Sequence, residues 1–419
     1  MIVKSFVLRE ETFRRIAGLC PDGTVAVIRP EKKLENLFKA AVHRTILEKQ
    51  PADAEFQAIR AYFEALSAEP AFLAKVDAAL HNVSAYLGEG MYVQATLRSV
   101  EDYVMVKCAR LCAEAVNMTL NAPLIDGTEL MICRQQGEKT VVDWNLSREQ
   151  ISQRCKVNAK TLIPGGYGRL ESGYVVRIGR GGAHVMAALI ASALQAERIE
   201  CYVEEDGIQG IPSMSYDEAA HYCASKAAPF PSASLWPAKK AGIPILVLNI
   251  LRPAFPGTCI SASSSHAEGT VSGVISDTDL SLITVYGTGL LGQVGMSSAI
   301  FSAMAQAGVN VRFISQSSSE YSITFAVRQE DRQAAEDAVS ALVQSEDDVL
   351  IISREVGIVT VYGDKMKNVP GVSAKVYAAL AAAGVNTIAA AQGGEELSIS
   401  IAVEAGRLDD AVKALAAIA

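Results

Sequence analysis

The residues with the clearest chemical potential form a short cluster of glycines with one arginine. The cluster comprises Gly179, Arg180, Gly181 and Gly182. It stands between a predicted strand at 174–178 and a long aliphatic helix predicted at about 184–196. Glycines at such a turn let backbone N–H groups approach an anion at a helix start, and an arginine can hold a carboxylate through two hydrogen bonds. The cluster therefore predicts an anion site, and close packing of the helix on the strand is the alternative interpretation.

Strands and helices alternate around this cluster. Short β-rich runs recur as TVAVIRP, ELMICR, TVVDWNL, TLIPGGYG, YVVRIG, ERIECYVE and PILVLNI. A helix is expected near 31–48, and residues 50–90 are expected to form a helical insertion. Strands separated by helices favour a mainly parallel α/β sheet.

The last third of the chain contains an internal repeat. Residues 359–403 match residues 283–327 without a gap, at a constant offset of 76 positions (359 minus 283). The matched positions include glycines and polar residues, such as Asn310 with Asn386. Matching polar residues are harder to obtain by chance than matching apolar ones, so the repeat indicates two copies of one structural unit.

Each copy has the same expected order of elements: strand, glycine loop, amphipathic helix, strand, turn, strand and closing helix. The corresponding ranges are 283–286, 296–307, 321–327 and 331–344 in the first copy, and 358–362, 372–383, 397–403 and 407–418 in the second. Gly308 and Gly384 suit the left-handed residue that often ends a helix. This order is that of a ferredoxin-like βαββαβ unit.

Bulk composition narrows the classes of function. The chain has 419 residues, 50% of them hydrophobic and 20% charged, which fits two or three soluble domains. A net charge of −8 argues against a nucleic-acid surface, and the sequence shows neither a signal peptide nor an apolar run of membrane length. The eight cysteines are scattered, and no second pair joins Cys108 and Cys112 as zinc ligands. Reduced core thiols in a cytoplasmic protein are therefore expected.

These motifs together resemble the aspartokinases. The run GRGGAH at 179–184 resembles the GRGGSD segment of that family, and SMSYDEAAHYCAS and KKAGIPILVLNILRPAFPGTCIS resemble its later segments. The stretches GVNVRFISQSSSEYSITF and GVNTIAAAQGGEELSISI resemble the tandem ACT domains that end it.

The resemblance implies an α/β protein with two parts. The first, residues 1–262, is expected to be an amino-acid-kinase-like αβα sandwich with a mainly parallel sheet. Two ferredoxin-like ACT domains are expected at 270–347 and 348–419, after a polar linker at 261–270. In the family, the stretch near 271–275 completes the second ACT domain, so the two would be interleaved in sequence.

The reaction implied by the resemblance is phosphoryl transfer from ATP, with Mg²⁺, to the side-chain carboxylate of L-aspartate. Lys4 matches the lysine of the family's first strand and loop, and Arg180 matches the arginine of GRGG; both are the predicted catalytic residues. Glu101 matches a glutamate that contacts aspartate, and with Arg180, Gly181 and Gly182 it forms the predicted substrate site. The alternative interpretations are a surface lysine beside a strand and an acid in the first turn of a helix.

The sequence departs from the family at several phosphate-binding positions. The glycine loop after the lysine is replaced by the run Phe6–Arg9, whose side chains block the close approach that glycine permits. Ala183 and His184 stand where the family has a serine and an orienting aspartate. A loop that wraps the nucleotide in the family is shortened here to IQGIP.

The nucleotide-binding residues implied by the resemblance are few. Glu204, Asp206 and Gly207 fall on the family's Thr-Asp-x-x-Gly segment. Lys226 is the candidate replacement for a family lysine that is Ala228 in this chain.

Three functions remain open at this point. The first is an aspartokinase with feedback control in amino-acid biosynthesis, feeding the lysine, threonine and methionine branch. The second is a pseudokinase that binds amino acids and regulates a partner, since each lost transition-state contact is worth about 3 kcal/mol. The third is a kinase-fold enzyme with a different acyl acceptor.

The ACT pair predicts an amino-acid effector, with lysine or threonine implied by the resemblance. The effector site is expected at Gly292, Val294, Asn310, Ser315 and Gln316 of the first ACT domain, where helix-start N–H groups would take the carboxylate. Pairing of exposed sheets predicts a homodimer through the ACT domains. Neither a resident metal site nor a nucleic-acid or membrane partner is expected.

Overall fold

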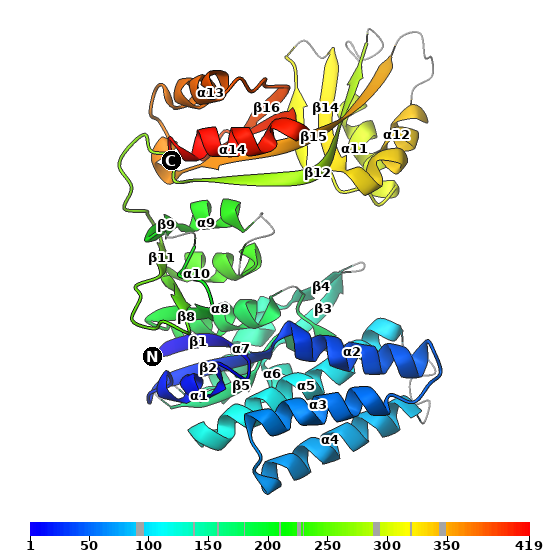
Figure 1. The fold of residues 1–419 in the computed structure, drawn as a ribbon, viewed down its shortest axis with the longest axis vertical. Helices are drawn as coiled ribbons and strands as arrows, with labels where there is room; N and C mark the ends of the chain where they lie inside the picture. Colours follow the sequence, from blue (N-terminus) through cyan, green and yellow to red (C-terminus); the bar gives the residue numbers. More distant parts are fainter. Residues whose placement is uncertain are drawn as a thin grey trace. The chain divides into compact units, whose positions relative to one another are not determined.

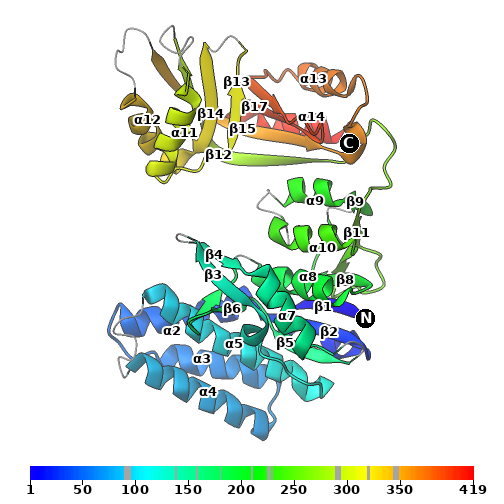
Figure 2. The same cartoon turned by 180° about the vertical axis from the view of Figure 1, so that it is seen from behind.

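The computed structural model of this chain describes most of the sequence. The described residues are 1–88, 96–136, 139–156, 159–179, 181–208, 211–223, 228, 230–287, 294–318, 321–342 and 349–419. The chain divides into two units, Met1–Ser263 and Ser264–Ala419, whose elements are labelled in Figures 1 and 2. None of the helices formed by the described residues is long and apolar enough to span a bilayer.

A seven-stranded sheet with the order β5-β2-β1-β8-β10-β11-β9 organises the first unit. The strands are β1 (Ile2–Leu8), β2 (Thr24–Pro30), β5 (Thr161–Pro164), β8 (Arg198–Val203), β9 (Ser213–Ser215), β10 (Ile245–Asn249) and β11 (Thr258–Ser261). The first five in spatial order run parallel, and β11 is antiparallel to β10. The predicted mainly parallel sheet is therefore confirmed, and its strand ends form the edge at which open α/β sheets bind ligands.

Helices cover both faces of this sheet (Figure 1). On one face lie α1 (Phe13–Gly18), α2 (Lys32–Ile46), α3 (Asp53–Leu66), α4 (Pro70–Gly88) and α5 (Leu97–Leu120). On the other lies α8 (Gly182–Leu194), with α7 (Trp144–Arg154) and α10 (Leu235–Ala241) against it. Alternate residues of β1 serve the two faces: Phe6 and Leu8 join the core under the first group, and Ser5 contacts α8. The predicted insertion at 50–90 forms α3 and α4.

The eight cysteines are free thiols, and six of them are buried. Cys108 and Cys112 lie one turn apart on α5, inside the core that this helix shares with α1–α4. Burial raises the pKa of Cys20 and of Cys133 to about 11, so both thiols stay protonated at neutral pH. This agrees with the prediction of core thiols.

Two predicted strands are shorter than expected because helices begin inside the predicted runs. α6 (Gly127–Leu130) occupies the start of ELMICR, which leaves β3 at Ile132–Gln136. The Asp143 side chain accepts a hydrogen bond from the Leu146 N–H and so starts α7, which ends β4 at Lys139–Val142. These strands join β6 (Tyr167–Leu170) and β7 (Val175–Arg177) in a four-stranded sheet of order β4-β3-β6-β7.

The second unit is built on one antiparallel sheet with the order β13-β14-β12-β15-β17-β16. Its strands are β12 (Gly273–Tyr286), β13 (Phe313–Gln316), β14 (Ser322–Arg328), β15 (Leu350–Tyr362), β16 (Ala389–Gln392) and β17 (Ser398–Glu404). Its α-helices are α11 (Met296–Gln306), α12 (Arg332–Ser340), α13 (Val372–Ala382) and α14 (Leu408–Ala416). The repeated elements fall where the repeat predicts them, although β12 and β15 are longer than expected.

The two long strands belong to both halves of the sheet. The second part of β12 pairs with β14, and its first part, from Gly273 to Asp277, pairs with the end of β15. The two copies build equivalent polar contacts: the Thr284 and Thr324 hydroxyls are 3.1 Å apart, and those of Thr360 and Ser400, at the repeat-related positions, are 2.8 Å apart. The copies therefore share structure as well as sequence.

Candidate functional site

A cavity of about 750 Å³ lies at the carboxyl ends of β2 and β5, in the first unit. Its walls come from α2, the start of α5, the turn between β5 and β6, the end of β7 and the start of α8. The predicted substrate residues Glu101, Gly181 and Gly182 all line it. Arg180, which precedes these two glycines in the sequence, lies outside the described residues.

The glycines at the start of α8 are required by close packing. Gly181 has φ 67°, and a Cβ there would lie 2.4 Å from Cδ of Pro231. A Cβ on Gly182 would lie 2.9 Å from the carbonyl oxygen of Gly166. The first turn of α8 lies at the cavity wall, and its Gly182 and His184 N–H groups donate to the carbonyls of Gly179 and Gly181. The structure therefore supports the packing interpretation of this motif, and anion binding by the turn stays a prediction.

The cavity wall is predominantly basic. The basic residues that line it among the described residues are Arg29, Lys32, Lys39, Arg98 and Arg177, against the acids Glu35 and Glu101. Lys32, Asn36 and Lys39 share one face of α2 because they are spaced four and three residues apart. Burial lowers the pKa of Arg29, and the charge of Glu35 opposes this shift. The cavity thus favours an anionic ligand.

Glu101 is held by two basic side chains. His43 Nε2 lies 2.7 Å from Glu101 Oε1, and an Arg177 guanidinium nitrogen lies 3.7 Å from Oε2. Arg177 also pairs with Asp102 at 3.2 Å, and its backbone N–H donates to the same carboxylate. Asp102 is only 3% exposed; burial raises its pKa, and the hydrogen bond and charge of Arg177 oppose that rise. These contacts fix Arg177 at the cavity wall.

His184 sits in the first turn of α8 and is 2% exposed. Its Nδ1 lies 2.8 Å from the Ser5 hydroxyl, and its Nε2 has no hydrogen-bond partner among the described residues. Burial, together with the charge of Arg29, lowers the pKa of His184 to about 3. The ring is therefore neutral at physiological pH, where the resemblance would place a carboxylate.

Lys4 does not line the cavity. Its Nζ lies 2.6 Å from Glu200 Oε2, and both residues are buried. Ser5 faces α8, so the strand's alternation turns Lys4 to the opposite face of the sheet. The lysine also lies four residues before the end of β1, well inside the sheet. This placement provides no contact with the cavity, so a catalytic role for Lys4 stays a prediction without support from its position.

The predicted nucleotide residues lie at the carboxyl end of β8. Glu204 pairs with Arg9 at 2.5 Å, and Asp206 pairs with Arg252 and accepts a hydrogen bond from Asn249. Arg9 and Glu204 line a smaller cavity of about 150 Å³, and Arg29 lines both cavities.

Two further predicted nucleotide residues give less information. Gly207 has φ 76°, and a Cβ there would lie 2.5 Å from the Thr258 hydroxyl, so its packing alone requires glycine. Lys226 lies outside the described residues.

The donor set of the larger cavity does not fit Mg²⁺. This ion takes carboxylate, carbonyl and water oxygens in octahedral geometry. Of the two acids on the described wall, Glu101 is bound to His43 and Arg177, and Glu35 faces the charge of Arg29. His184 presents a neutral ring beside them. The side chains here are suited to neutralising an anion directly.

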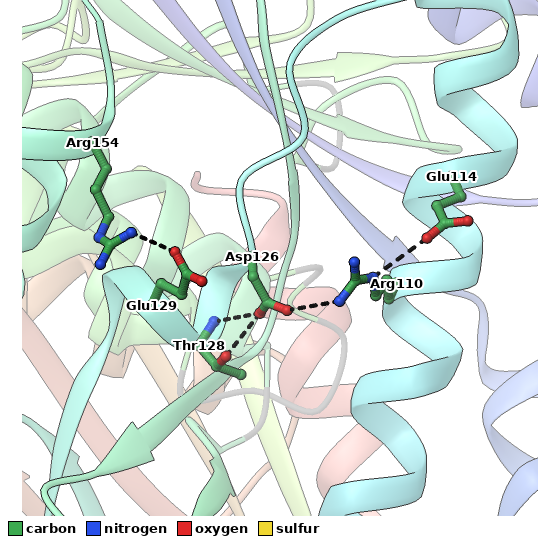
Figure 3. Close-up of polar contacts among 6 residues, drawn as sticks. All are labelled: Arg110, Glu114, Asp126, Thr128, Glu129 and Arg154. Carbon is green, nitrogen blue, oxygen red and sulfur yellow. Dashed lines mark hydrogen bonds and ion pairs between the residues drawn. The ribbon is translucent and has the colours of Figure 1, made fainter. Parts of the chain in front are cut away.

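A separate polar cavity of about 370 Å³ carries charges that already neutralise one another (Figure 3). Arg154 pairs with Glu129 at 2.5 Å, and Arg110 pairs with Glu114 at 3.3 Å and Asp126 at 3.5 Å. Asp126 also accepts hydrogen bonds from the backbone and hydroxyl of Thr128. Its arginines are therefore engaged, whereas Arg29 of the larger cavity has no ion pair with any described carboxylate.

The predicted effector residues are partly described. Val294 is fully exposed, and the side chains of Asn310 and Gln316 are exposed beside the start and end of β13. The Ser315 hydroxyl donates to the carbonyl of Ala390 in β16, which links the two repeats. Gly292 lies outside the described residues. The structure therefore leaves Asn310 and Gln316 accessible to a ligand and places Ser315 in a structural contact.

Sequence reasoning missed Arg29 and Arg177, the two arginines that the fold delivers to the cavity. Each is a charged residue at the carboxyl end of an otherwise apolar strand. For Arg29, in the parallel sheet, that position is where functional side chains are exposed, so this signal was available in the sequence. For Arg177 it was not, because β7 pairs antiparallel with β6 in the smaller sheet.

Two protein families match the chain. The amino acid kinase family matches residues 40–249, and the ACT domain matches residues 283–344 and 359–417.

Curated relatives point the same way. The bifunctional aspartokinase/homoserine dehydrogenase of Haemophilus influenzae is 32% identical over 260 residues, covering 58% of this chain and 32% of that protein. The chloroplastic bifunctional aspartokinase/homoserine dehydrogenase 1 of Arabidopsis thaliana is 28% identical over 376 residues, covering 83% of this chain and 41% of that protein. The chain thus spans about a third to two fifths of the length of these relatives.

Solved structures share the whole fold. The aspartate kinase of Clostridium acetobutylicum superposes with a TM-score of 0.82 at 20% identity and covers all of both chains. Aspartokinase III of E. coli, in complex with aspartate and ADP, gives a TM-score of 0.80 at 18% identity, over 99% of this chain and 98% of that one. Together with the glycine turn before α8 and the repeated unit, these matches show that the chain belongs to the amino acid kinase family, as an aspartokinase-type member with C-terminal tandem ACT domains.

Proposed function

We propose that the first unit transfers the γ-phosphoryl group of ATP to the side-chain carboxylate of L-aspartate. A bond forms between a carboxylate oxygen and the γ-phosphorus, the bond to the β,γ-bridging oxygen breaks, and ADP leaves; no proton is exchanged. The observation that carries the proposal is the basic cavity at the ends of β2 and β5, with Glu101, Gly181 and Gly182 on its wall. The choice of substrates is supported by E. coli aspartokinase III, which was solved in complex with aspartate and ADP.

Two arginines of the cavity are suited to different tasks. Arg177, anchored by Asp102 and Glu101 through one terminal nitrogen, is suited to hold a carboxylate of the acceptor with its other terminal nitrogen. Arg29, which borders both cavities, lies where charge on the transferred group can be offset. Orientation and charge compensation are the main tasks in phosphoryl transfer, because the protein need not form a covalent bond.

The test is an assay of acyl phosphate, trapped with hydroxylamine as the hydroxamate, with ATP and L-aspartate in buffers containing Mg²⁺ and, separately, EDTA. We expect aspartate hydroxamate and ADP in equal amounts. Arg177→Gln should lower the rate at least about tenfold, since the loss of one charge-assisted contact of about 1.4 kcal/mol or more has that effect.

Arg134→Gln is the matched control for this assay, because Arg134 is exposed, pairs with Asp143 and does not line the cavity. It should keep the wild-type rate. If hydroxamate forms only with another amino acid, that amino acid is the acceptor in place of L-aspartate. If no amino acid yields hydroxamate, the kinase proposal is contradicted.

A second candidate is a regulator that binds amino acids without turnover. Three observations favour it: Lys4 is bound to Glu200 away from the cavity, the ring of His184 is neutral, and Glu204 and Asp206 are already paired with arginines. The regulator would bind L-aspartate but release no ADP, so the same assay combined with aspartate titration separates the two functions.

For the second unit we propose that the first ACT domain binds an amino-acid effector, lysine or threonine, in a homodimer joined through ACT sheets. The complex of E. coli aspartokinase III with lysine and aspartate supports the first of these effectors. Asn310→Ala should weaken effector binding about tenfold, measured by isothermal titration of each amino acid, because it removes an exposed polar contact worth about 1.4 kcal/mol.

The repeat supplies the matched control. Asn386 occupies the equivalent position in the second ACT domain and is also exposed. Asn386→Ala should leave the affinity unchanged. Equal losses in both variants would place the effector between the two domains, and no loss in Asn310→Ala would remove the first domain's site from consideration.

A further inference from the structure

The larger cavity supplies positive charge from three directions. Arg29 comes from the end of β2, Lys32 and Lys39 come from α2, and Arg177 comes from the end of β7. Within the described part of the chain, no carboxylate pairs with Arg29, Lys32 or Lys39 at ion-pair distance. These three groups are therefore available to a ligand, whereas the arginines of the 370 Å³ cavity are already paired.

Of the two acids on the same described wall, Glu101 is held by bases and Glu35 lies near the charge of Arg29. Glu101 is bound by His43 and Arg177, so binding a metal would require breaking two contacts. Glu35 lies close enough to Arg29 for their charges to interact, and the positive charge of Arg29 disfavours a cation at Glu35. Guanidinium and ammonium groups carry donors only, and cannot act as ligands of Mg²⁺.

His184 completes this donor set. It is almost fully buried at the first turn of α8, and Nε2, on the side of the ring away from the Ser5 contact, has no partner among the described residues. In the tautomer in which the Ser5 hydroxyl donates to Nδ1, Nε2 carries the ring hydrogen and is the atom that can donate to a ligand oxygen. A carboxylate at this position would repel a phosphate oxygen unless a cation lay between them; a neutral N–H donor needs no such cation.

We propose that this cavity binds the polyphosphate chain of its nucleotide without a divalent cation, with Arg29, Lys32 and Lys39 providing the charge that Mg²⁺ would otherwise provide. The proposal rests on the proposed use of a nucleotide by this site. Arg29 is the natural centre of the contact, because it borders both the larger cavity and the smaller one beside Glu204.

The experiment is isothermal titration of the full chain with ATP, and with inorganic tripolyphosphate, in EDTA and in excess Mg²⁺. We expect binding in EDTA, and binding weakened about tenfold by Mg²⁺, because the cation cancels charge that the basic wall would contact; tenfold corresponds to about 1.4 kcal/mol. Binding only in the presence of Mg²⁺, or no binding in either buffer, would overturn the proposal.

Lys33 provides a matched control for the basic residues. It is exposed on α2 beside Lys32 but does not line the cavity. In EDTA, Arg29→Gln and the double substitution Lys32→Gln/Lys39→Gln should each lower the affinity about tenfold or more, and Lys33→Gln should change it less than about twofold. Equal losses in all three would show a diffuse charge effect and contradict a defined site.

His184→Asp tests the role of the missing carboxylate. An acid is favoured in the first turn of a helix but costs stability at a buried position, so the folding of this variant is verified first. In His184→Asp, Mg²⁺ should strengthen ATP binding. In His184→Asn, as in the wild type, Mg²⁺ should weaken ATP binding. Should His184→Asp fail to fold, the lysine and arginine variants still decide the question.

The outcomes also separate this inference from the kinase proposal. Binding in EDTA with no acyl phosphate under any condition would support metal-free binding and end the kinase proposal. Turnover that requires Mg²⁺, with no ATP binding in EDTA, would support the kinase proposal and overturn metal-free binding.

Discussion

Glu200→Gln is expected to destabilise the first unit by about 3–5 kcal/mol, because it leaves the Lys4 ammonium buried without a counter-charge. Lys4 is 6% exposed and Glu200 is 4% exposed, and Nζ and Oε2 are 2.6 Å apart. Glu200 also accepts hydrogen bonds from Arg198 at 2.8 Å and Tyr202 at 3.0 Å. Burial alone would raise the pKa of Glu200, but the bonds from Lys4 and Arg198 outweigh it and lower the pKa.

Urea unfolding followed by tryptophan fluorescence measures this loss selectively. Both tryptophans, Trp144 and Trp236, belong to the first unit, so the signal reports on Met1–Ser263 within the full chain. Glu197→Gln is the control, because Glu197 is an exposed partner of the same Arg198 and should cost less than about 1 kcal/mol.

A double substitution refines the interpretation. Lys4→Met/Glu200→Gln removes the stranded charge and should recover most of the lost stability. If Glu200→Gln were no more damaging than Glu197→Gln, the ion pair would not be the contact that holds β1 to β8. If the double variant kept the phosphoryl-transfer rate, Lys4 would have no part in catalysis.

Acidification from about pH 6.5 to about pH 4.5 is expected to lower the free energy of unfolding of the wild type by about 2–3 kcal/mol more than that of His184→Asn. The folded-state pKa of His184 is lowered to about 3 by burial and by Arg29, whereas an unfolded histidine titrates near 6.5. Between these values the unfolded chain binds a proton that the folded chain does not. The stability is therefore complete above about pH 6.5 and falls as the pH is lowered towards 3.

The measurement is the urea midpoint of the tryptophan signal at half-unit steps of pH. Carboxylates begin to titrate near the lower end of this window, but both proteins share them, so the difference between the two proteins isolates one imidazole. Asn can keep a hydrogen bond to Ser5 without gaining a charge, which makes it the suitable replacement. Parallel pH profiles for the two proteins would contradict a buried neutral ring.

The sequence predicted the second unit better than the first. Matching glycines and polar residues at a constant offset identify the two ACT copies, because both obey the same local rules for strands, helix ends and turns. The full length of β12 and β15 was not predictable from periodicity, since their additional residues are set by pairing with each other across the sheet.

The candidate site was predictable only in part, because it depends on which face each residue meets. The position of Lys4 in the first strand suggested a functional lysine, but alternation along β1 turns it away from α8 and into an ion pair. Glu101 reaches the cavity as predicted from the resemblance, yet its two basic partners come from α2 and β7, far away in sequence. Long-range partners of this kind follow from the fold and not from local spacing.

The continuity of β12 and β15 through both ACT domains also has a consequence for biosynthesis and truncation. During synthesis, the first residues of β12 emerge before the rest of the first domain, whereas their partners at the end of β15 emerge after it. The second domain therefore folds onto a segment that was synthesised before the first domain. A product cut short after β14 would leave one side of β12 exposed as an unpaired edge along its full length. Such an edge recruits other chains, so premature termination in this region should yield aggregates and not a functional single-domain receptor.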